Sequence, residues 1–129
     1  MLIVIDKHSG VPIFRQIVEQ VKHQILTGGL DEGAALTSVK DLSRDLRINP
    51  MTVSKAYGLL EMDGFLERRR GIGLFIRRPQ QDLTKRTKRT LLEDALAKPV
   101  VQAVQMDVSE PEFLELARKL YRHYRPEGS

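Results

Sequence analysis

The stretch that decides the fold is LTSVKDLSRDLRINPMTVSKAYGLLEMDGFLERRRGIGLFI, residues 36–76. Its first half carries two short runs with apolar residues at helical spacing, separated by the tight turn Arg47-Ile48. Its second half carries two short segments typical of strands, on either side of Gly71-Ile72-Gly73. Two helices joined by a tight turn and followed by a hairpin are therefore expected here.

The first helix of this stretch is predicted over 39–46. Ser38 and Asp41 stand three residues apart, as in a capping box in which Asp replaces the usual Glu. The second helix starts at Asn49, which can cap it, and Pro50, which suits its first position, and it ends before Gly64. Its apolar residues predict a buried stripe that consists of Val53, Ala56, Tyr57 and Leu60, which leaves Met51, Ser54, Lys55 and Gly58 exposed.

The hairpin is predicted to pair a strand over 65–70 with a strand over 74–78. Gly71 and Gly73 flank the connection and allow the positive φ angles that tight hairpin turns require. Pro79 ends the second strand because it lacks the N–H that a ladder needs.

Outside this stretch the pattern is mostly helical. Residues 2–6 (LIVID) favour a short strand or an extended arm, and residues 12–27 favour an amphipathic helix. The polar run 80–90 is either a linker or the exposed start of a helix. From Leu91 the helical pattern returns; Pro99 is expected to kink or divide it, and Ser109 with Glu112 signals a last helix start.

These elements predict a mainly α fold with a small β wing. Residues 1–79 would form a winged helix-turn-helix DNA-binding domain, and residues 80–129 a short two-helix segment for dimerisation. In such a domain the second helix of the pair enters the major groove and the first braces it across the DNA backbone. The hairpin can then reach phosphates or the minor groove.

The positive charge is concentrated in one segment. The chain of 129 residues has a formal net charge of +4 and a pI of about 9.6. Residues 68–89 contain nine basic side chains and one acidic one, a net of +8, while residues 1–67 and 90–129 each carry −2. Such clustering beside a hairpin favours a polyanion partner over a merely solvated surface.

Two segments of the sequence resemble a known family of proteins. Residues 36–76 resemble the DNA-binding domain of the GntR family of bacterial transcription regulators, most specifically in the Asn49-Pro50 pair, the TVSKAY run 52–57 and the wing sequence Arg70-Gly71-Ile72-Gly73. GVPIFRQIVEQVKHQILTGGL, residues 10–30, and the short C-terminal part resemble the YtrA-like subfamily. That resemblance implies a repressor on a palindromic operator, and transporter genes as targets.

The resemblance implies a set of DNA-contacting residues. They lie at the start of the first helix of the motif, in the recognition helix and in the wing: Ser38, Lys40, Asn49, Pro50, Met51, Thr52, Ser54, Lys55, Arg69, Arg70, Gly71 and Gly73. Thr37 stands where the family usually has proline, and Lys40 where it usually has arginine. Lysine lacks the bidentate fork with which arginine reads guanine.

The C-terminal segment presents more apolar surface than a domain with its own closed core needs. Its helical stripes favour a homodimer, with candidate contacts at Leu92, Leu96, Phe113, Leu120, Tyr121 and Tyr124. A part this small cannot enclose a typical ligand cavity of ~300–1,000 Å³. A small-molecule effector would therefore bind between subunits or where the two parts meet.

Other classes of function find less support. The chain has no Cys, its three His lie in separate elements, and no acid, base and nucleophile come together, so we expect no metal site, no cofactor and no enzyme. No apolar run is long enough for a membrane span, and we expect a cytoplasmic protein. The alternative function is a winged helix that binds an acidic protein partner through its basic surface.

Overall fold

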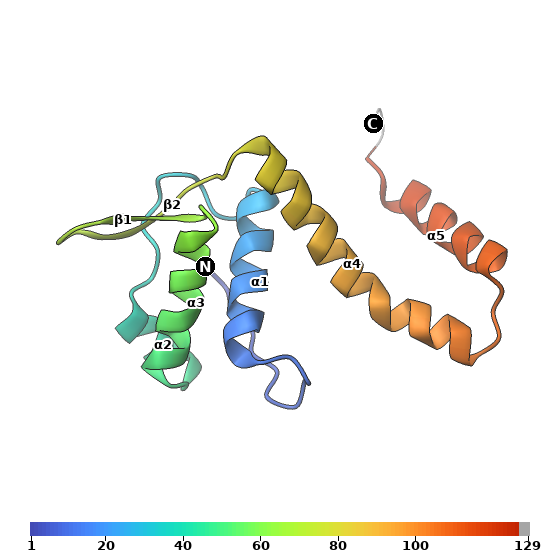
Figure 1. Cartoon of the computed structure of the whole chain (residues 1–129), viewed down its shortest axis with the longest axis horizontal. Helices are drawn as coiled ribbons and strands as arrows, with labels where there is room; N and C mark the ends of the chain where they lie inside the picture. Colours follow the sequence, from blue (N-terminus) through green and yellow to red (C-terminus); the bar gives the residue numbers. More distant parts are fainter. Residues whose placement is uncertain (127–129) are drawn as a thin grey trace. The chain divides into compact units, whose positions relative to one another are not determined.

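The structure is a computed structural model that describes residues 1–126. These residues form five helices and one two-stranded antiparallel sheet (Figure 1), so the predicted mainly α fold with a small β wing is confirmed. The elements are α1 (Ile13–Leu26), α2 (Val39–Leu46), α3 (Pro50–Met62), β1 (Leu66–Arg69), β2 (Gly73–Ile76), α4 (Gln81–Gln105) and α5 (Glu110–Tyr124).

The chain forms two compact units, Met1–Leu91 and a second one from Leu92 onward. The first part of α4, up to Leu91, therefore belongs to the unit that holds α1, α2, α3 and the sheet. A domain boundary at residue 79 stays a prediction.

The core of the first unit is built between α1 and α3. These helices contact each other because each presents a stripe of apolar side chains at three- and four-residue spacing. The largest side chains with essentially no solvent exposure are Ile17, Val21, Val53, Tyr57, Leu60 and Phe65. The four residues predicted as the buried stripe of α3 are all buried, which fixes the opposite face of that helix toward solvent.

The two-stranded wing sheet has an additional isolated bridge on the free side of β2, between Ala35 and Phe75, which the sequence does not predict. β1 and β2 pair from Leu66 with Ile76 to Arg69 with Gly73, so the strands end earlier than predicted and leave Arg77 and Arg78 outside them. On the other side of β2, Leu36 donates to the Leu74 carbonyl and Ile76 to the Ala34 carbonyl, both at 2.8 Å. The segment before α2 is thereby tied to the wing.

Residues 2–6 form an extended arm and no strand. Three glutamines one turn apart on α1 hold this arm through its backbone. The Gln20 side-chain amide accepts from Val4 N–H at 2.9 Å and donates to the Val4 carbonyl at 2.7 Å, and Gln16 makes the same pair of bonds with Asp6. Ile3 is buried as a result.

The polar run 80–90 starts a helix, because α4 begins at Gln81 and buries Thr84 and Thr87. α4 continues through Pro99 to Gln105, so the proline does not divide this segment, and the predicted alternative, a kink at Pro99, stays a prediction. Pro99 cannot donate to the carbonyl of residue 95, but Ala95 is exposed and water can satisfy its carbonyl. Ser109 caps α5 as predicted: its Oγ accepts from the Glu112 N–H at 3.3 Å.

Candidate nucleic-acid interface

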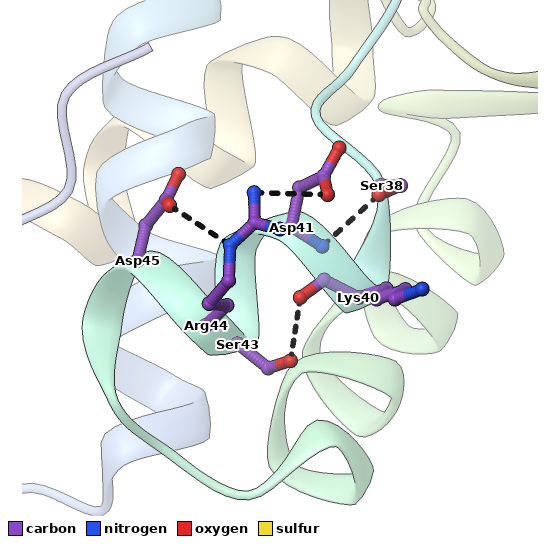
Figure 2. Close-up of polar contacts among 6 residues, drawn as sticks. All are labelled: Ser38, Lys40, Asp41, Ser43, Arg44 and Asp45. Atoms are coloured by element: carbon purple, nitrogen blue, oxygen red, sulfur yellow. Dashed lines mark hydrogen bonds and ion pairs between the residues drawn. The ribbon is translucent and has the colours of Figure 1, made fainter.

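Side chains at the N-terminus of α2 cap the helix and pair with one another, whereas the Lys40 side chain extends into solvent. Ser38 Oγ accepts from the Asp41 N–H at 3.1 Å, which confirms the predicted cap. Asp41 Oδ1 pairs with Arg44 Nη2 at 3.2 Å (Figure 2). The Lys40 side chain points away from these pairs in Figure 2, is exposed, and has no ion pair within residues 1–126.

The turn between α2 and α3 is set by two backbone features. Arg47 adopts a left-handed conformation with φ 56°, although it has a side chain, and its N–H bonds back to the Arg44 carbonyl. Asn49 Oδ1 then accepts from the Met51 N–H at 2.8 Å, and Pro50 occupies the first position of α3, both as predicted. Asn49 therefore uses its side-chain oxygen to start the helix.

The face of α3 opposite the core carries small, flexible and polar side chains. Ser54 and Gly58 are exposed, Met51 is 78% exposed, and Thr52 is half-buried. A Cβ added at Gly58 would meet no atom within 4 Å. The α3 backbone at Gly58 is therefore accessible to another molecule. This accessibility gives a structural explanation for a glycine inside a helix, which the sequence pattern alone does not explain.

Lys55 is exposed, as predicted, and its side chain also contacts α1. Its Nζ stands 3.9 Å from the centre of the Phe14 ring on α1, a cation–π contact. The side chain is exposed but leans toward α1. Phe14 was not among the predicted site residues, and no local sequence signal pairs positions 14 and 55.

The tip of the wing is shaped by glycine and carries arginine. Gly71 and Gly73 have φ angles of 74° and 142°, so both use conformations that other residues rarely adopt, as predicted. Arg69 stacks on Phe75, with its Cζ 4.1 Å from the ring centre. Arg70 is exposed at the tip and has no ion pair within residues 1–126.

A shallow hollow joins the wing to the start of α2. Its volume is about 270 Å³, and its lining includes Ser38, Arg68 and Gly73. Two of the predicted site residues, Ser38 before α2 and Gly73 of the wing, therefore lie along the same hollow. Arg68 is the basic residue of segment 68–89 that lines this hollow. Four other basic residues of the segment are exposed on α4: Lys85, Arg86, Lys88 and Arg89.

The second unit keeps most of its apolar residues exposed. Five of the six predicted dimer contacts, Leu92, Leu96, Leu120, Tyr121 and Tyr124, are exposed by 49–77%, and Phe113 is half-buried. A groove of about 610 Å³ runs between α4 and α5 within this unit, lined among others by Leu96, Pro99, Phe113, Leu120 and Tyr124. Among its residues up to 126, only Ala103 is buried.

The helix-turn-helix, its open recognition face and the arginine-bearing wing define a winged-helix transcription regulator that binds DNA. Residues 14–76 match the family described as bacterial regulatory proteins, gntR family. The chain belongs to this GntR family, as the sequence resemblance predicts.

Similar proteins support this assignment across both units. The chain is 36% identical over 102 residues to the HTH-type transcriptional repressor YtrA of Bacillus subtilis, covering 79% of this chain and 78% of the relative. A solved structure described as a transcriptional antiterminator from Listeria monocytogenes matches with a TM-score of 0.69 and 30% identity over 93% of this chain and 90% of the other. YtrA from Sulfolobus acidocaldarius, a GntR-family transcription factor, matches with a TM-score of 0.56 and 26% identity over 95% and 98%.

Residues 1–126 contain neither a membrane-spanning helix nor a cluster of metal-binding side chains. No helix in this range has the length and apolarity needed to cross a bilayer. No group of three or more His, Asp or Glu side chains is placed to hold a metal ion in this part of the chain. The curated relative named above is a transcription regulator, which is a class of binding protein rather than of enzyme.

Proposed function

We propose that the protein is a homodimeric repressor that binds a palindromic operator and controls transporter genes. Each subunit would place the exposed face of α3 in a major groove and the Arg69–Gly73 wing tip against the neighbouring backbone. As a repressor of bacterial genes it would act in the cytoplasm. The target class comes from the subfamily resemblance alone.

The observation that carries the proposal is the exposed face of α3. Met51, Ser54 and Gly58 form a surface without bulky rigid side chains, and a major groove about 12 Å wide admits a helix of this kind. Lys40 and the wing arginines flank it with positive charge that can bind phosphates. Ser38, Asn49 and Pro50 support this surface, since they fix the starts of α2 and α3.

A second copy of the chain is the partner that the second unit fits. α5 has no buried residue. Helices gain most of their stability from packing of an apolar face, and the apolar faces of this two-helix unit are largely exposed in the single chain. The groove between α4 and α5 would take the equivalent helix of the partner. A two-fold dimer would also present two α3 helices to half-sites about 34 Å apart. A small-molecule effector would be the further partner of this interface.

The test is binding of the full chain to a duplex from upstream of its own gene. The duplex is titrated with salt from about 50 to 200 mM and challenged with excess random DNA. We expect one dimer per duplex, retention against the competitor and a steep fall of the association constant with salt. Footprinting then gives the operator and shows whether it is a palindrome.

Two other outcomes would contradict the proposal. Equal loss to random DNA would mean that the protein binds DNA without selecting a site there, and the screen would move to a genomic fragment library. Absence of binding even at low salt would refute the DNA function and favour the alternative of an acidic protein partner.

A further inference from the structure

We propose that Arg15 and Lys55, gathered around the ring of Phe14, form a seat for one phosphate of the DNA backbone where α1 meets α3. The proposal rests on the DNA-binding function above and adds α1 to the interface. It assigns a role to Arg15 and Phe14, and it changes the role of Lys55 from reading bases to holding the backbone.

Two cations approach the same aromatic ring. Lys55 Nζ lies 3.9 Å from the centre of the Phe14 ring, and Arg15 Cζ lies 5.9 Å from it. Both cationic side chains are exposed, and neither has an ion pair within residues 1–126. Because both cations lie near the same ring, an anion bound beside that ring is attracted by both.

Phe14 is placed to organise this pair. Its ring is half-buried and packs against the core of the first unit, so its position is fixed by the contact between α1 and α3. A lysine side chain has four rotatable bonds and loses much entropy when it binds at one place. The aromatic ring holds the ammonium group before DNA arrives, and it therefore acts as a positioning residue.

The seat lies where a DNA backbone would pass. With 3.6 residues per turn, Met51 and Gly58 lie near the middle of the exposed face of α3, and Lys55 lies on the margin toward α1. In Figure 1 the N-terminal ends of α1 and α3 lie at the same end of the unit. When the middle of this α3 face enters the major groove, the margin that carries Lys55 lies against the sugar-phosphate backbone of one DNA strand along the edge of the groove.

The test measures how the association constant depends on salt for charge-removing and charge-keeping variants of the full chain. Each phosphate contact contributes about −0.9 to the slope of log K against log salt. Arg15→Gln and Lys55→Gln should each flatten the slope by part of that amount, and the double variant by about the whole of it per bound subunit. All three should weaken binding to operator and to random DNA to the same degree. Arg15→Lys and Lys55→Arg keep the charge and should retain the slope.

Phe14 is tested by Phe14→Leu, which keeps an apolar side chain, and by Phe14→Tyr, which keeps the aromatic face. We expect the leucine variant to lower affinity for operator and random DNA alike, and the tyrosine variant to restore it. Thermal unfolding of all variants separates a loss of fold from a loss of binding, and both Arg15 variants change an exposed side chain only.

If the wild type binds DNA and both Arg15→Gln and Lys55→Gln keep its slope of log K against log salt, the phosphate site is refuted. The proposed DNA-binding function is then still supported. A changed base preference in Lys55→Gln, with its slope unchanged, would also refute the phosphate site. Absence of wild-type binding would instead refute the proposed function itself.

Discussion

The hydroxyl of Tyr57 donates a hydrogen bond of 2.7 Å to the carbonyl of Thr37. Tyr57 lies in the middle of α3 and is completely buried, and Thr37 immediately precedes the cap of α2. One bond therefore ties the recognition helix to the start of its bracing helix. It also reaches the wing indirectly, because the neighbouring Leu36 donates to the Leu74 carbonyl of β2.

Tyr57→Phe should destabilise the protein by about 1 kcal/mol, because the Thr37 carbonyl loses its side-chain donor in a partly buried place. The aromatic ring and its packing stay. Denaturant unfolding of wild type and variant at pH 7 measures the difference. An equal free energy of unfolding would show that water replaces the hydroxyl without cost.

Tyr57 also makes stability depend on pH at the alkaline end. Burial raises the pKa of its hydroxyl well above the ordinary value of 10, because the phenolate is poorly solvated there. Below pH 10 both the folded and unfolded states keep the proton, so the full stability is present. Above pH 10 the unfolded chain loses the proton first, and the free energy of unfolding should fall by up to about 1.4 kcal/mol per pH unit.

The control for this pH dependence is the same Tyr57→Phe variant. Tyr121 and Tyr124 are exposed, so they remain as the tyrosines common to both proteins. Between pH 10 and 11.5 the wild-type curve should fall more steeply than that of the variant. Parallel curves would contradict the assignment of the alkaline loss to Tyr57.

The sequence predicted the elements whose signals are local. The caps at Ser38, Asn49 and Ser109 have the expected bonds, because a cap needs only residues within one turn. The stripe of α3 was predicted because burial repeats with the helix period. Those two kinds of signal placed the exposed face of α3 correctly.

The features that the sequence did not predict all depend on contacts between distant positions. The glutamines of α1 hold the arm, and Phe14 contacts Lys55. These contacts join positions 10–41 residues apart, and nothing in the local pattern links them. The polar start of α4 stayed undecided because Thr84 and Thr87 look solvent-exposed by composition, yet both are buried. Tertiary packing decided these cases.

Gly58→Ala should raise stability and lower DNA affinity at once. An alanine at an exposed helix position is favoured over glycine by about 0.5–1 kcal/mol, and its methyl group has open space in the free protein. If the α3 backbone approaches base edges closely, the same methyl group should weaken operator binding by roughly tenfold, or about 1.4 kcal/mol.

Thermal unfolding and operator binding measured on the same sample check both halves of this prediction. Met62→Ala is the matched control, since Met62 is 80% exposed at the far end of α3 and should affect neither affinity nor site preference. Undiminished affinity of Gly58→Ala would mean that the middle of this face does not approach DNA closely.

The two wing arginines should have different effects when each is replaced by Ala. Arg70→Ala removes an exposed cation at the tip, so it should flatten the salt slope by about 0.9 and leave stability unchanged. Arg69→Ala should weaken DNA binding too, and should also cost about 0.5–1 kcal/mol of stability, because Arg69 stacks on Phe75. Neither variant should change which sequence is preferred. If the slope stays at the wild-type value in both variants, the wing does not touch phosphate.

Leu120→Glu should separate the dimer and unfold the second unit together. Leu120 lines the groove between α4 and α5 and is 55% exposed in the single chain, so a carboxylate there would be buried without a partner if two copies associate. Sedimentation should give a monomer, and circular dichroism should lose helix signal, because α5 has no buried residue of its own. Lys119→Glu introduces the same carboxylate one position away on the polar side of α5 and should leave the dimer intact.

Wild type diluted to nanomolar concentration should lose the same helix signal, since a unit without its own core is stable only while its partner is bound. A Leu120→Glu protein that sediments as a dimer would place the interface elsewhere and free the groove for a small-molecule ligand.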